Sequence, residues 1–538
     1  MEFRSLIKKL FDRLYIKPSE LLLTLKGEYV LFIFIVDLVY TLLFNVPIFY
    51  IYRNEGFFDS SFLVRSYFIT LLLNMAIFLS LSIFRIVFYI SIPVIFVLSA
   101  ITTFLILNFK VALNMNAMAL VFETNVHEAS GVTGREMILF VIGSLLIAFI
   151  ILLVFYRRVK PVSRKAIVYL ILIQILLINY PVMKVFSFKF RGIPNDLYLY
   201  TVKYLKEKRE SIKLSRKRTD LTDKYRFDYK NNDMIVVMII GEAERGYNWS
   251  SNGYHRETDR DMKSLGAISY KNAYSCGTIT RVSVPCMLTR ATFNNKDISK
   301  REKSAISIFN RLGFETYWIS NQGVMGEHET PITPIINESQ NKVFVNISGA
   351  FEDKDVLDEN IIPVFKNVID KKPDRMFIVV HLIGSHWYYE HHYTENFRIF
   401  NPICKSKFGQ KCSREELANS YDNSLLYTDW VVSQLMKAVS DRNSLVFFVS
   451  DHGESLGEDG VYTHRVEHIN RMEQRSVAWF VYASDEYKKR HRDFYNNIVN
   501  NKDKYISHDN LFHSLLDCAS IESEAIDRSL SLCREINE

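Results

Sequence analysis

Three polar segments of this sequence each follow an apolar run, and they hold the residue types that bind metal ions. Glu242 comes one residue after the run MIVVMII, and Asp451 and His452 come directly after SLVFFVS. His386 follows a third run, MFIVVHL, within a few residues. Two carboxylates and an imidazole form a ligand set that suits zinc or manganese. If the three segments meet in space, they predict metal-assisted chemistry.

A hydroxyl-rich segment, SCGTITRVSVPC from Ser275 to Cys286, lies between the first of these runs and the others. A hydroxyl is a weak nucleophile at neutral pH unless a base or a metal ion lowers its pKa. The turn at Gly277 and a bridge between the two cysteines would present such a hydroxyl rigidly. Spacing alone does not choose among the three candidates, which are Thr278, Thr280 and Ser283.

The elements that must position these residues read as a sheet of buried strands separated by helices. Four apolar runs predict strands at Met234–Ile240, Thr316–Ser320, Met376–Leu382 and Ser444–Val449, with helix-like segments such as Lys303–Leu312 and Leu417–Ala438 between them. This alternation predicts an α/β/α sandwich with a mainly parallel sheet over residues 233–538. Ligands of such sheets bind beyond the carboxyl ends of the strands.

The N-terminal part of the chain has a different composition, because long uncharged runs crowd residues 30–187. A span needs about 20 mainly apolar residues to cross roughly 30 Å of hydrocarbon. A transmembrane domain of five helices is therefore predicted over residues 1–187, and a basic connector over residues 188–232. The predicted spans are Val30–Tyr52, Ser66–Phe84, Ile86–Phe109, Met137–Tyr156 and Ala166–Val185.

Lys and Arg in the short flanks of these spans set the expected orientation. They are frequent in the N-terminal segment and between the fourth and fifth spans, so both are expected in the cytoplasm. Five spans that start inside end outside, which places the C-terminal domain across the membrane. The basic connector is expected either to lie on anionic headgroups or to form a solvated helix.

Cysteine usage agrees with export, because all six cysteines follow the last predicted span. An even number of cysteines in an exported domain predicts disulfides. Proximity in the sequence favours three pairs, which are Cys276 with Cys286, Cys404 with Cys412, and Cys518 with Cys533. A net charge of +7 over 538 residues gives no support to nucleic-acid binding.

Several motifs together resemble those of bacterial phosphoethanolamine transferases, which are membrane-anchored members of the alkaline phosphatase and sulfatase superfamily. This family includes the lipid A modifying enzymes of polymyxin and colistin resistance. The five-span layout also resembles the family, so the resemblance covers nearly the whole chain. The motifs are GEAERG from Gly241, SNGYHRET from Ser251, SCGTITRVSVPCM from Ser275, HLIGSH from His381 and SDHGESLGEDGVYTH from Ser450.

The resemblance implies a catalytic site and a reaction. Thr280 would be the nucleophile and, with Glu242, Asp451 and His452, would bind one firmly held zinc ion. His386 and His464 would lie near the substrate phosphate or a second zinc ion. The implied reaction is a ping-pong transfer of phosphoethanolamine from phosphatidylethanolamine through a threonine intermediate, with release of diacylglycerol.

The resemblance also implies a setting for this reaction. The protein would be a monomer of the bacterial inner membrane, in contact with membrane lipids, with its catalytic domain in the periplasm. Thr124 and Glu128 would line the donor site. Lipid A is the first acceptor implied and core oligosaccharide the second. Periplasmic glucan and protein also stay open, because Leu120 and Arg465 depart from the family pattern and Ser320–Thr330 lacks the cysteines of many lipid A enzymes.

Three alternatives compete with this hypothesis. An arylsulfatase would use a maturation motif like Cys286 to Arg290, but the required proline is replaced by Leu288. A glycerol-phosphate transferase of the lipoteichoic acid synthase type would share five spans and a threonine nucleophile. An inactive membrane scaffold or sensor would need none of the metal-binding residue types, so their full set disfavours it.

Overall fold

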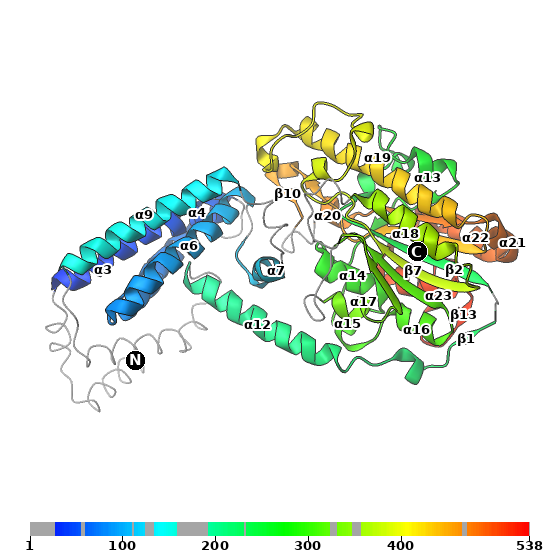
Figure 1. Ribbon diagram of the computed structural model, residues 1–538, viewed down its shortest axis with the longest axis horizontal. Coiled ribbons are helices and arrows are strands. Elements are labelled where there is room, and N and C mark those ends of the chain that lie inside the picture. Colours follow the sequence, from blue (N-terminus) through cyan, green and yellow to red (C-terminus); the bar gives the residue numbers. More distant parts are fainter. Residues whose placement is uncertain are drawn as a thin grey trace. The chain divides into compact units, whose positions relative to one another are not determined.

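The computed structural model describes residues 27–54, 60–109, 112–123, 134–158, 192–230, 233–322, 331–346, 357–464 and 471–536. The chain divides into two compact units (Figure 1). The membrane unit comprises Met1–Phe122 with Thr133–Leu205, and the soluble unit comprises Glu123–Val132 with Lys206–Glu538. The division at residue 205 falls inside a helix, whereas the predicted boundary at residue 187 lies outside the described residues.

The membrane unit is helical. Three of its described helices are long and apolar enough to cross a membrane, at Leu31–Asn54, Arg85–Asn108 and Arg135–Phe155, and Ser66–Ser82 is a shorter apolar helix. They match the first, third, fourth and second predicted spans, and the fifth, Ala166–Val185, lies outside the described residues. The elements are α3 (Gly27–Tyr40), η1 (Thr41–Asn45), α4 (Val46–Asn54), α5 (Ser60–Ser82), α6 (Arg85–Phe109), α7 (Met115–Glu123), α9 (Arg135–Arg158) and α12 (Asn195–Ser215).

Buried amides tie the start of α12 to the spans. Asn45 donates from Nδ2 to the carbonyl of Ile193 at 3.0 Å and accepts the Ile193 N–H at 2.8 Å. Asn74 donates to the same carbonyl at 3.2 Å and accepts from Asn195 at 2.8 Å. Polar groups in an apolar bundle must find internal partners, and here they fix the backbone that leads into α12.

A seven-stranded mixed sheet forms the centre of the soluble unit, in the order β3-β11-β8-β2-β7-β5-β6. The strands from β8 to β6 pair in parallel, and β11 pairs antiparallel with both β8 and β3. The four predicted strands are all present, and β3, β6 and β11 were not predicted. The bounds are β2 (Met234–Gly241), β3 (Ile268–Ser269), β5 (Glu315–Ser320), β6 (Asn341–Phe344), β7 (Arg375–His381), β8 (Ser444–Ser450) and β11 (Trp479–Ala483).

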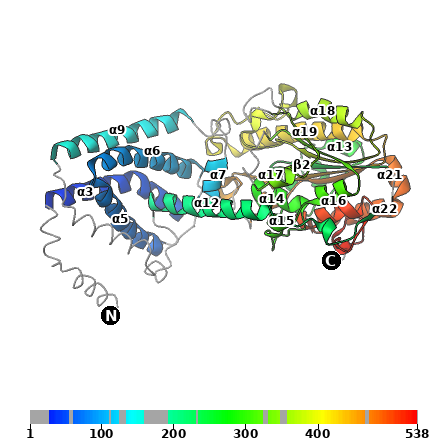
Figure 2. The same ribbon diagram turned by 60° about the horizontal axis from the view of Figure 1, so that its bottom comes forward.

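Helices cover both faces of this sheet because each face of its central strand is apolar. Alternate residues of β2 enter two different cores, with Val236 and Met238 in one, and Ile235 and Val237 in the other. Helices α14 and α16 lie over the first face, and α18 and α19 lie over the second (Figure 2). The helices are α13 (Arg260–Ser264), α14 (Thr280–Leu288), α15 (Ile298–Arg301), α16 (Ala305–Arg311), α17 (Thr333–Ile336), α18 (Ile361–Ile369), α19 (Arg414–Ala438), α20 (Met472–Arg475), α21 (Asp485–Arg490), α22 (Arg492–Asn500) and α23 (Leu511–Asp517).

Short ladders and three disulfides complete the soluble unit. The predicted pairs Cys276–Cys286, Cys404–Cys412 and Cys518–Cys533 are each joined in the structure. The ladders pair β1 (Asp228–Tyr229) with β13 (Ile521–Glu522), β9 (Ser455–Leu456) with β10 (Tyr462–Thr463), and β4 (Ala273–Tyr274) with β12 (Ile506–Ser507).

Candidate active site

The carboxyl ends of two neighbouring strands bring the predicted metal ligands together. Strands β2 and β8 are parallel neighbours, with Gly241 opposite Ser450. The residues that follow, Glu242 on one strand and Asp451 and His452 on the other, therefore emerge side by side. One ligand atom from each of these three residues lies within 4.8 Å of the other two. All three side chains are almost completely buried.

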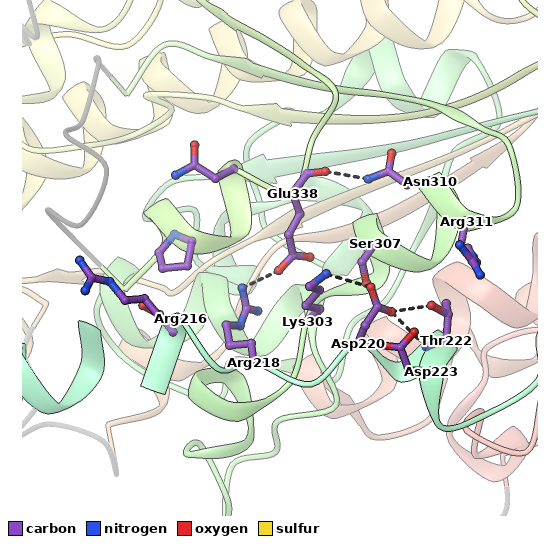
Figure 3. A pocket seen from close by; sticks show the side chains of 13 residues that line it. Arg216, Arg218, Asp220, Thr222, Asp223, Lys303, Ser307, Asn310, Arg311 and Glu338 are labelled. Carbon is purple, nitrogen blue, oxygen red and sulfur yellow. Dashed lines mark hydrogen bonds and ion pairs between the residues drawn. The ribbon is translucent and has the colours of Figure 1, made fainter. Parts of the chain in front are cut away.

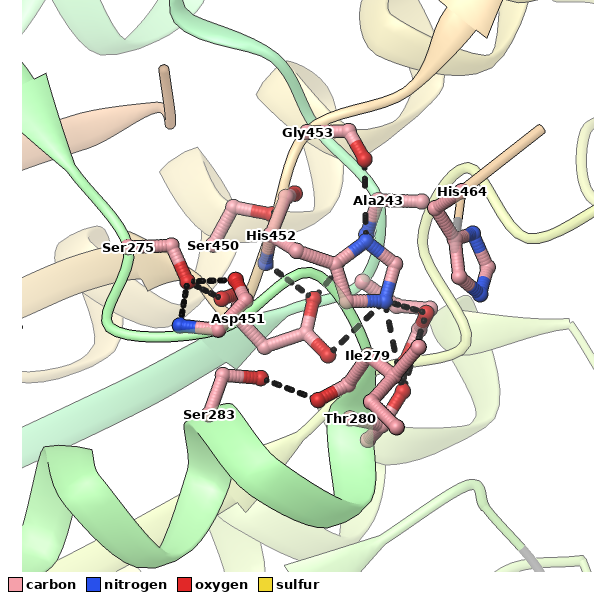
Figure 4. A network of polar contacts seen from close by, with 12 residues as sticks. Ala243, Ser275, Ile279, Thr280, Ser283, Ser450, Asp451, His452, Gly453 and His464 are labelled. Carbon is pink, nitrogen blue, oxygen red and sulfur yellow. Dashed lines mark hydrogen bonds and ion pairs between the residues drawn. The ribbon is translucent and has the colours of Figure 1, made fainter. Parts of the chain in front are cut away.

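Helix α14 presents the Thr280 hydroxyl to these ligands (Figure 4). Thr280 is the first residue of α14, and its Oγ1 lies 3.2 Å from Glu242 Oε2 and 3.4 Å from His452 Nε2. Ser275 Oγ donates to the carbonyl of Asp451 at 2.6 Å and so ties the preceding loop to β8. Ser283, another candidate, donates to Ile279 within the helix at 2.9 Å. Thr278 is buried, and Thr280 is the hydroxyl with described contacts to the ligands.

The charged residues of this cluster change one another's pKa values. His452 Nε2 lies 3.3 Å from both Glu242 Oε1 and Asp451 Oδ2. Although burial opposes the charged imidazolium, these two carboxylates raise the pKa of His452 to about 10. Burial also acts against ionised Glu242, but the hydrogen bond and charge of His452 lower its pKa. For Asp451, burial and the neighbouring Glu242 charge together raise the pKa.

One oxygen of Asp451 shows that the cluster fits a metal ion. Asp451 Oδ1 accepts the N–H of His452 at 2.7 Å and that of Ala243 at 3.2 Å. Asp451 Oδ2 is buried and accepts no hydrogen bond from any residue that the structure describes. His452 Nδ1 donates to the carbonyl of Gly453 at 2.9 Å, which directs Nε2 toward the carboxylates. Two carboxylates, one imidazole and one hydroxyl in this arrangement suit tetrahedral zinc.

A second group of possible ligands adjoins the first and contains His452, Glu454 and His464. His464 Nδ1 donates to Glu454 Oε2 at 2.9 Å, and its ring lies 3.9 Å from that of His452 between centroids. Tyr389 donates to the other Glu454 oxygen at 3.2 Å. Burial and the nearby His452 lower the pKa of His464. This group places a second imidazole directly beside the cluster.

The structure places most, though not all, of the predicted site residues in one region. Glu242, Thr280, Asp451, His452 and His464 lie together, and His386 is near enough to Glu242 for its charge to affect that pKa. His386 Nδ1 donates to the Trp387 carbonyl at 2.6 Å. Thr124 and Glu128 lie outside the described residues.

Two further residues of the site had no assigned role in the sequence analysis. Gln322 follows β5, and its Nε2 donates to the Leu382 carbonyl at 2.7 Å and lies 3.4 Å from Glu242 Oε2. Glu454 lies in the motif that follows β8 and pairs with His464. Their position directly after predicted strands is the signal that could have identified both.

The soluble unit also contains a pocket of about 600 Å³ that shares no lining residue with the cluster (Figure 3). Arg218 and Glu338 pair in it at 2.5 Å, and Lys303 pairs with Asp220 at 2.9 Å. The charges of these four lining residues are thus compensated within the protein.

Comparison with known proteins places this site in a family. The "Sulfatase" family model matches residues 235–521, more than half of the chain, so the chain belongs to the sulfatase family. A second model, "Phosphoethanolamine transferase EptA/EptB", matches residues 70–192. The two models therefore match different parts of the chain, and the chain spans slightly more than half the length of the first curated relatives that it matches.

Individual relatives agree with this placement. The chain is 32% identical to phosphoethanolamine transferase EptA of Escherichia coli K12 over 317 residues, 56% of this chain and 57% of that protein. The integral membrane lipooligosaccharide phosphoethanolamine transferase A of Neisseria meningitidis matches with a TM-score of 0.78 at 23% identity, over 94% of this chain and 98% of that one. The periplasmic domain of Escherichia coli EptC, solved in complex with Zn, matches with a TM-score of 0.52 at 24% identity, over 58% and 90% of the two chains.

One alternative is contradicted by the geometry. A sulfatase of the cysteine-maturation type needs a free thiol at Cys286, but this residue is joined to Cys276. The match to the sulfatase family over residues 235–521 therefore describes the fold of the soluble unit, and not a cysteine-derived nucleophile at position 286.

Proposed function

We propose that this protein transfers phosphoethanolamine from phosphatidylethanolamine to an acceptor of the bacterial cell envelope through a covalent intermediate on Thr280. The observation that carries the proposal is the Thr280 hydroxyl at 3.2 Å from Glu242 Oε2, at the N-terminus of α14, beside two buried carboxylates and an imidazole. The relatives named above supply the transferred group and the kind of acceptor, which is lipooligosaccharide for the Neisseria protein.

Zinc is the cofactor that we propose for this site, held by Glu242, Asp451, His452 and Thr280. When bound, a zinc ion would lower the pKa of the Thr280 hydroxyl and polarise the phosphoryl oxygens. The buried Asp451 Oδ2 without a hydrogen bond is the structural support for this assignment. His464 and Glu454, together with His452, form the adjoining group of possible ligands, which could bind a second ion.

In the first half of the reaction, Thr280 gives up its proton to solvent, and its Oγ1 attacks the phosphorus of phosphatidylethanolamine. The new bond joins Oγ1 to phosphorus, and the bond between phosphorus and the glycerol oxygen breaks. That oxygen takes up a proton, for which His464 or His386 is the proposed donor, and diacylglycerol leaves. The N-terminus of α14 directs its dipole toward the phosphate and favours its negative charge.

In the second half, a hydroxyl or phosphate oxygen of the acceptor attacks the same phosphorus. The bond to Thr280 Oγ1 breaks, and the histidine that gave up a proton takes one from an attacking hydroxyl. Lipid A is the acceptor that we propose first, and core oligosaccharide second. Donor and glycolipid acceptor both reside in the bilayer, which explains why a catalytic domain of this kind would be joined to a membrane unit.

Mass spectrometry of the full-length protein in detergent tests this proposal. After incubation with phosphatidylethanolamine and zinc, we expect one added phosphoethanolamine on the peptide that contains Thr280, together with released diacylglycerol. Thr280→Ala should abolish both, whereas Thr278→Ala, which removes a neighbouring hydroxyl of the same loop, should retain them. A modified Thr280→Ala protein would contradict the assignment of the nucleophile, and addition of glycerol phosphate from phosphatidylglycerol would instead support the glycerol-phosphate alternative.

A further inference from the structure

The turn that carries Glu242 contains a residue in an unfavourable backbone conformation. Ala243, between Glu242 and Glu244, has a φ of 61°. An L-residue with a Cβ rarely adopts this left-handed region, because the Cβ approaches the following carbonyl oxygen. Such a residue persists only where the surrounding structure holds it, and these residues concentrate at functional sites. Contacts to the peptide groups around Ala243 must therefore stabilise the turn.

Tyr421 on α19 supplies two of those contacts. Its hydroxyl donates to the Ala243 carbonyl at 2.7 Å and accepts the Arg245 N–H at 2.8 Å. The side chain is fully buried between α19 and the sheet. Burial raises the pKa of Tyr421 well above its usual value, so the hydroxyl keeps the proton that it donates. One oxygen atom thus bridges the peptide groups on both sides of Glu244.

The conformation of Ala243 also determines where two ligands lie. With Ala243 left-handed, its N–H donates to Asp451 Oδ1 at 3.2 Å, and the next N–H, of Glu244, donates to Ser450 Oγ at 2.8 Å. The carbonyl of Glu242 accepts the Ser385 N–H at 2.9 Å. A change of φ at Ala243 would redirect these peptide groups, release Asp451 Oδ1 and shift the Glu242 side chain.

We propose that the Tyr421 hydroxyl is a positioning group for the metal site, which holds Ala243 left-handed and thereby keeps Glu242 and Asp451 in their ligand geometry. This inference rests on the proposed zinc site and assigns no contact between Tyr421 and substrate. It differs from a purely structural role, because it predicts that the effect of losing the hydroxyl depends on the residue at position 243.

The test compares Tyr421→Phe in two backgrounds, the natural chain and Ala243→Gly, with zinc affinity of the full-length protein measured by competition with a chromophoric chelator. In the natural chain we expect Tyr421→Phe to weaken zinc binding about tenfold, the scale of one strained residue. In the Ala243→Gly background the loss should be at most about threefold, because glycine adopts a positive φ without steric cost. Tyr270→Phe is the matched control, since this buried hydroxyl donates to the Ile498 carbonyl at 2.8 Å outside the site.

Each outcome is decisive. Equal losses of affinity in the two backgrounds would overturn the proposal, and so would unchanged affinity in Tyr421→Phe. If Tyr421→Phe does not fold but the double variant does, the rescue supports the proposal; if neither folds, the role is wider than this turn and the proposal fails. Glu242→Gln tests the proposed zinc site separately from the role of Tyr421. If that variant keeps its zinc affinity, the proposed zinc site is wrong. If it loses zinc affinity while Tyr421→Phe binds zinc normally, the zinc site stands and only the role of Tyr421 is wrong.

Discussion

His508 joins the loop of the proposed nucleophile to the strand of the proposed metal ligands. The N–H of Cys276 donates to His508 Nδ1 at 3.4 Å, and His508 Nε2 donates to the Ser450 carbonyl at 3.0 Å. The ring is completely buried, and burial lowers the pKa of His508 to about 3. A neutral imidazole with its proton on Nε2 is the form that satisfies both contacts, so the two segments are held at a fixed distance.

Loss of this ring should impair transfer to Thr280. His508→Ala leaves two backbone groups without partners and a cavity in the core, which should lower the free energy of unfolding by about 2–4 kcal/mol. We expect the rate of Thr280 labelling by phosphatidylethanolamine to fall more than zinc affinity, because three of the four proposed ligands follow β2 and β8, whereas Thr280 follows the loop that His508 contacts. His491→Ala is the control, because this histidine is only partly buried and its Nδ1 contacts Ser520 Oγ away from the site. An unchanged labelling rate would show that the loop is held by other contacts.

Removal of metal should destabilise the natural protein but not the ligand variants. Two buried carboxylates repel each other, and a bound cation at 100 times its Kd would add about 2.7 kcal/mol to the free energy of unfolding. Chelation with EDTA should therefore lower the Tm, and zinc should restore it. In Asp451→Asn, which retains an acceptor for the Ala243 N–H, we expect a higher metal-free Tm and little response to zinc. A full zinc response in this variant would contradict the assignment of Asp451 Oδ2 as a ligand.

Loss of either of two disulfides should lower stability by a similar amount, but only one of them should affect activity. Cys276–Cys286 encloses Thr280, whereas Cys518–Cys533 lies elsewhere in the soluble unit. Replacing both cysteines of either pair with alanine should cost about 2–4 kcal/mol of unfolding free energy. Only the Cys276 and Cys286 variant should also lose Thr280 labelling, measured under conditions where both proteins are folded. Equal labelling in the two variants would show that the bridge does not position the nucleophile.

Acid should destabilise the soluble unit partly through His513. This side chain is 6% exposed, its Nδ1 accepts the Asp527 N–H at 3.0 Å, and burial lowers its pKa from 6.5 to about 4. The unfolded chain then binds a proton below pH 6.5 that the folded chain takes up only near pH 4. The stabilisation is complete above pH 6.5 and is lost as the pH falls toward 4, by about 2 kcal/mol at pH 5.

The variant His513→Asn tests this pH dependence. Asparagine can accept the same N–H but does not titrate, so the fall in unfolding free energy between pH 7.5 and pH 5 should be smaller than in the natural protein. His255→Asn, at an exposed position, is the control and should leave the fall unchanged. An identical pH dependence in all three proteins would exclude His513 as a contributor.

Features that depend only on residues close together in the sequence could be predicted from the sequence. The runs that form β2, β5, β7 and β8 are apolar because both faces of a central strand are covered, and this requirement is visible in each run by itself. Four apolar helices of the membrane unit follow from length and composition in the same way. The disulfide pairs join cysteines separated by 8 to 15 residues, so proximity was a sufficient guide.

The edge of the sheet was harder to predict. Strand β11 is an apolar run, WFVYA, whose antiparallel direction depends on its pairing with β8 and not on its own residues. Strand β3 has only two residues, too few to show a period. Short edge strands of this kind are defined by their partner.

By itself, the sequence determined the residue types of the site and their places after strands, because these are local properties. The motif resemblance named Thr280, whereas spacing alone left Thr278, Thr280 and Ser283 open. Only the tertiary structure decided that Gln322 and Glu454 join the site and that Tyr421 contacts the Ala243 turn. The physical reason is that the contacts of Thr280 and Gln322 with Glu242, and of Tyr421 with Ala243, join residues 38 to 178 positions apart. Their meeting depends on the order of the strands and on how α14 and α19 pack against opposite faces of the sheet.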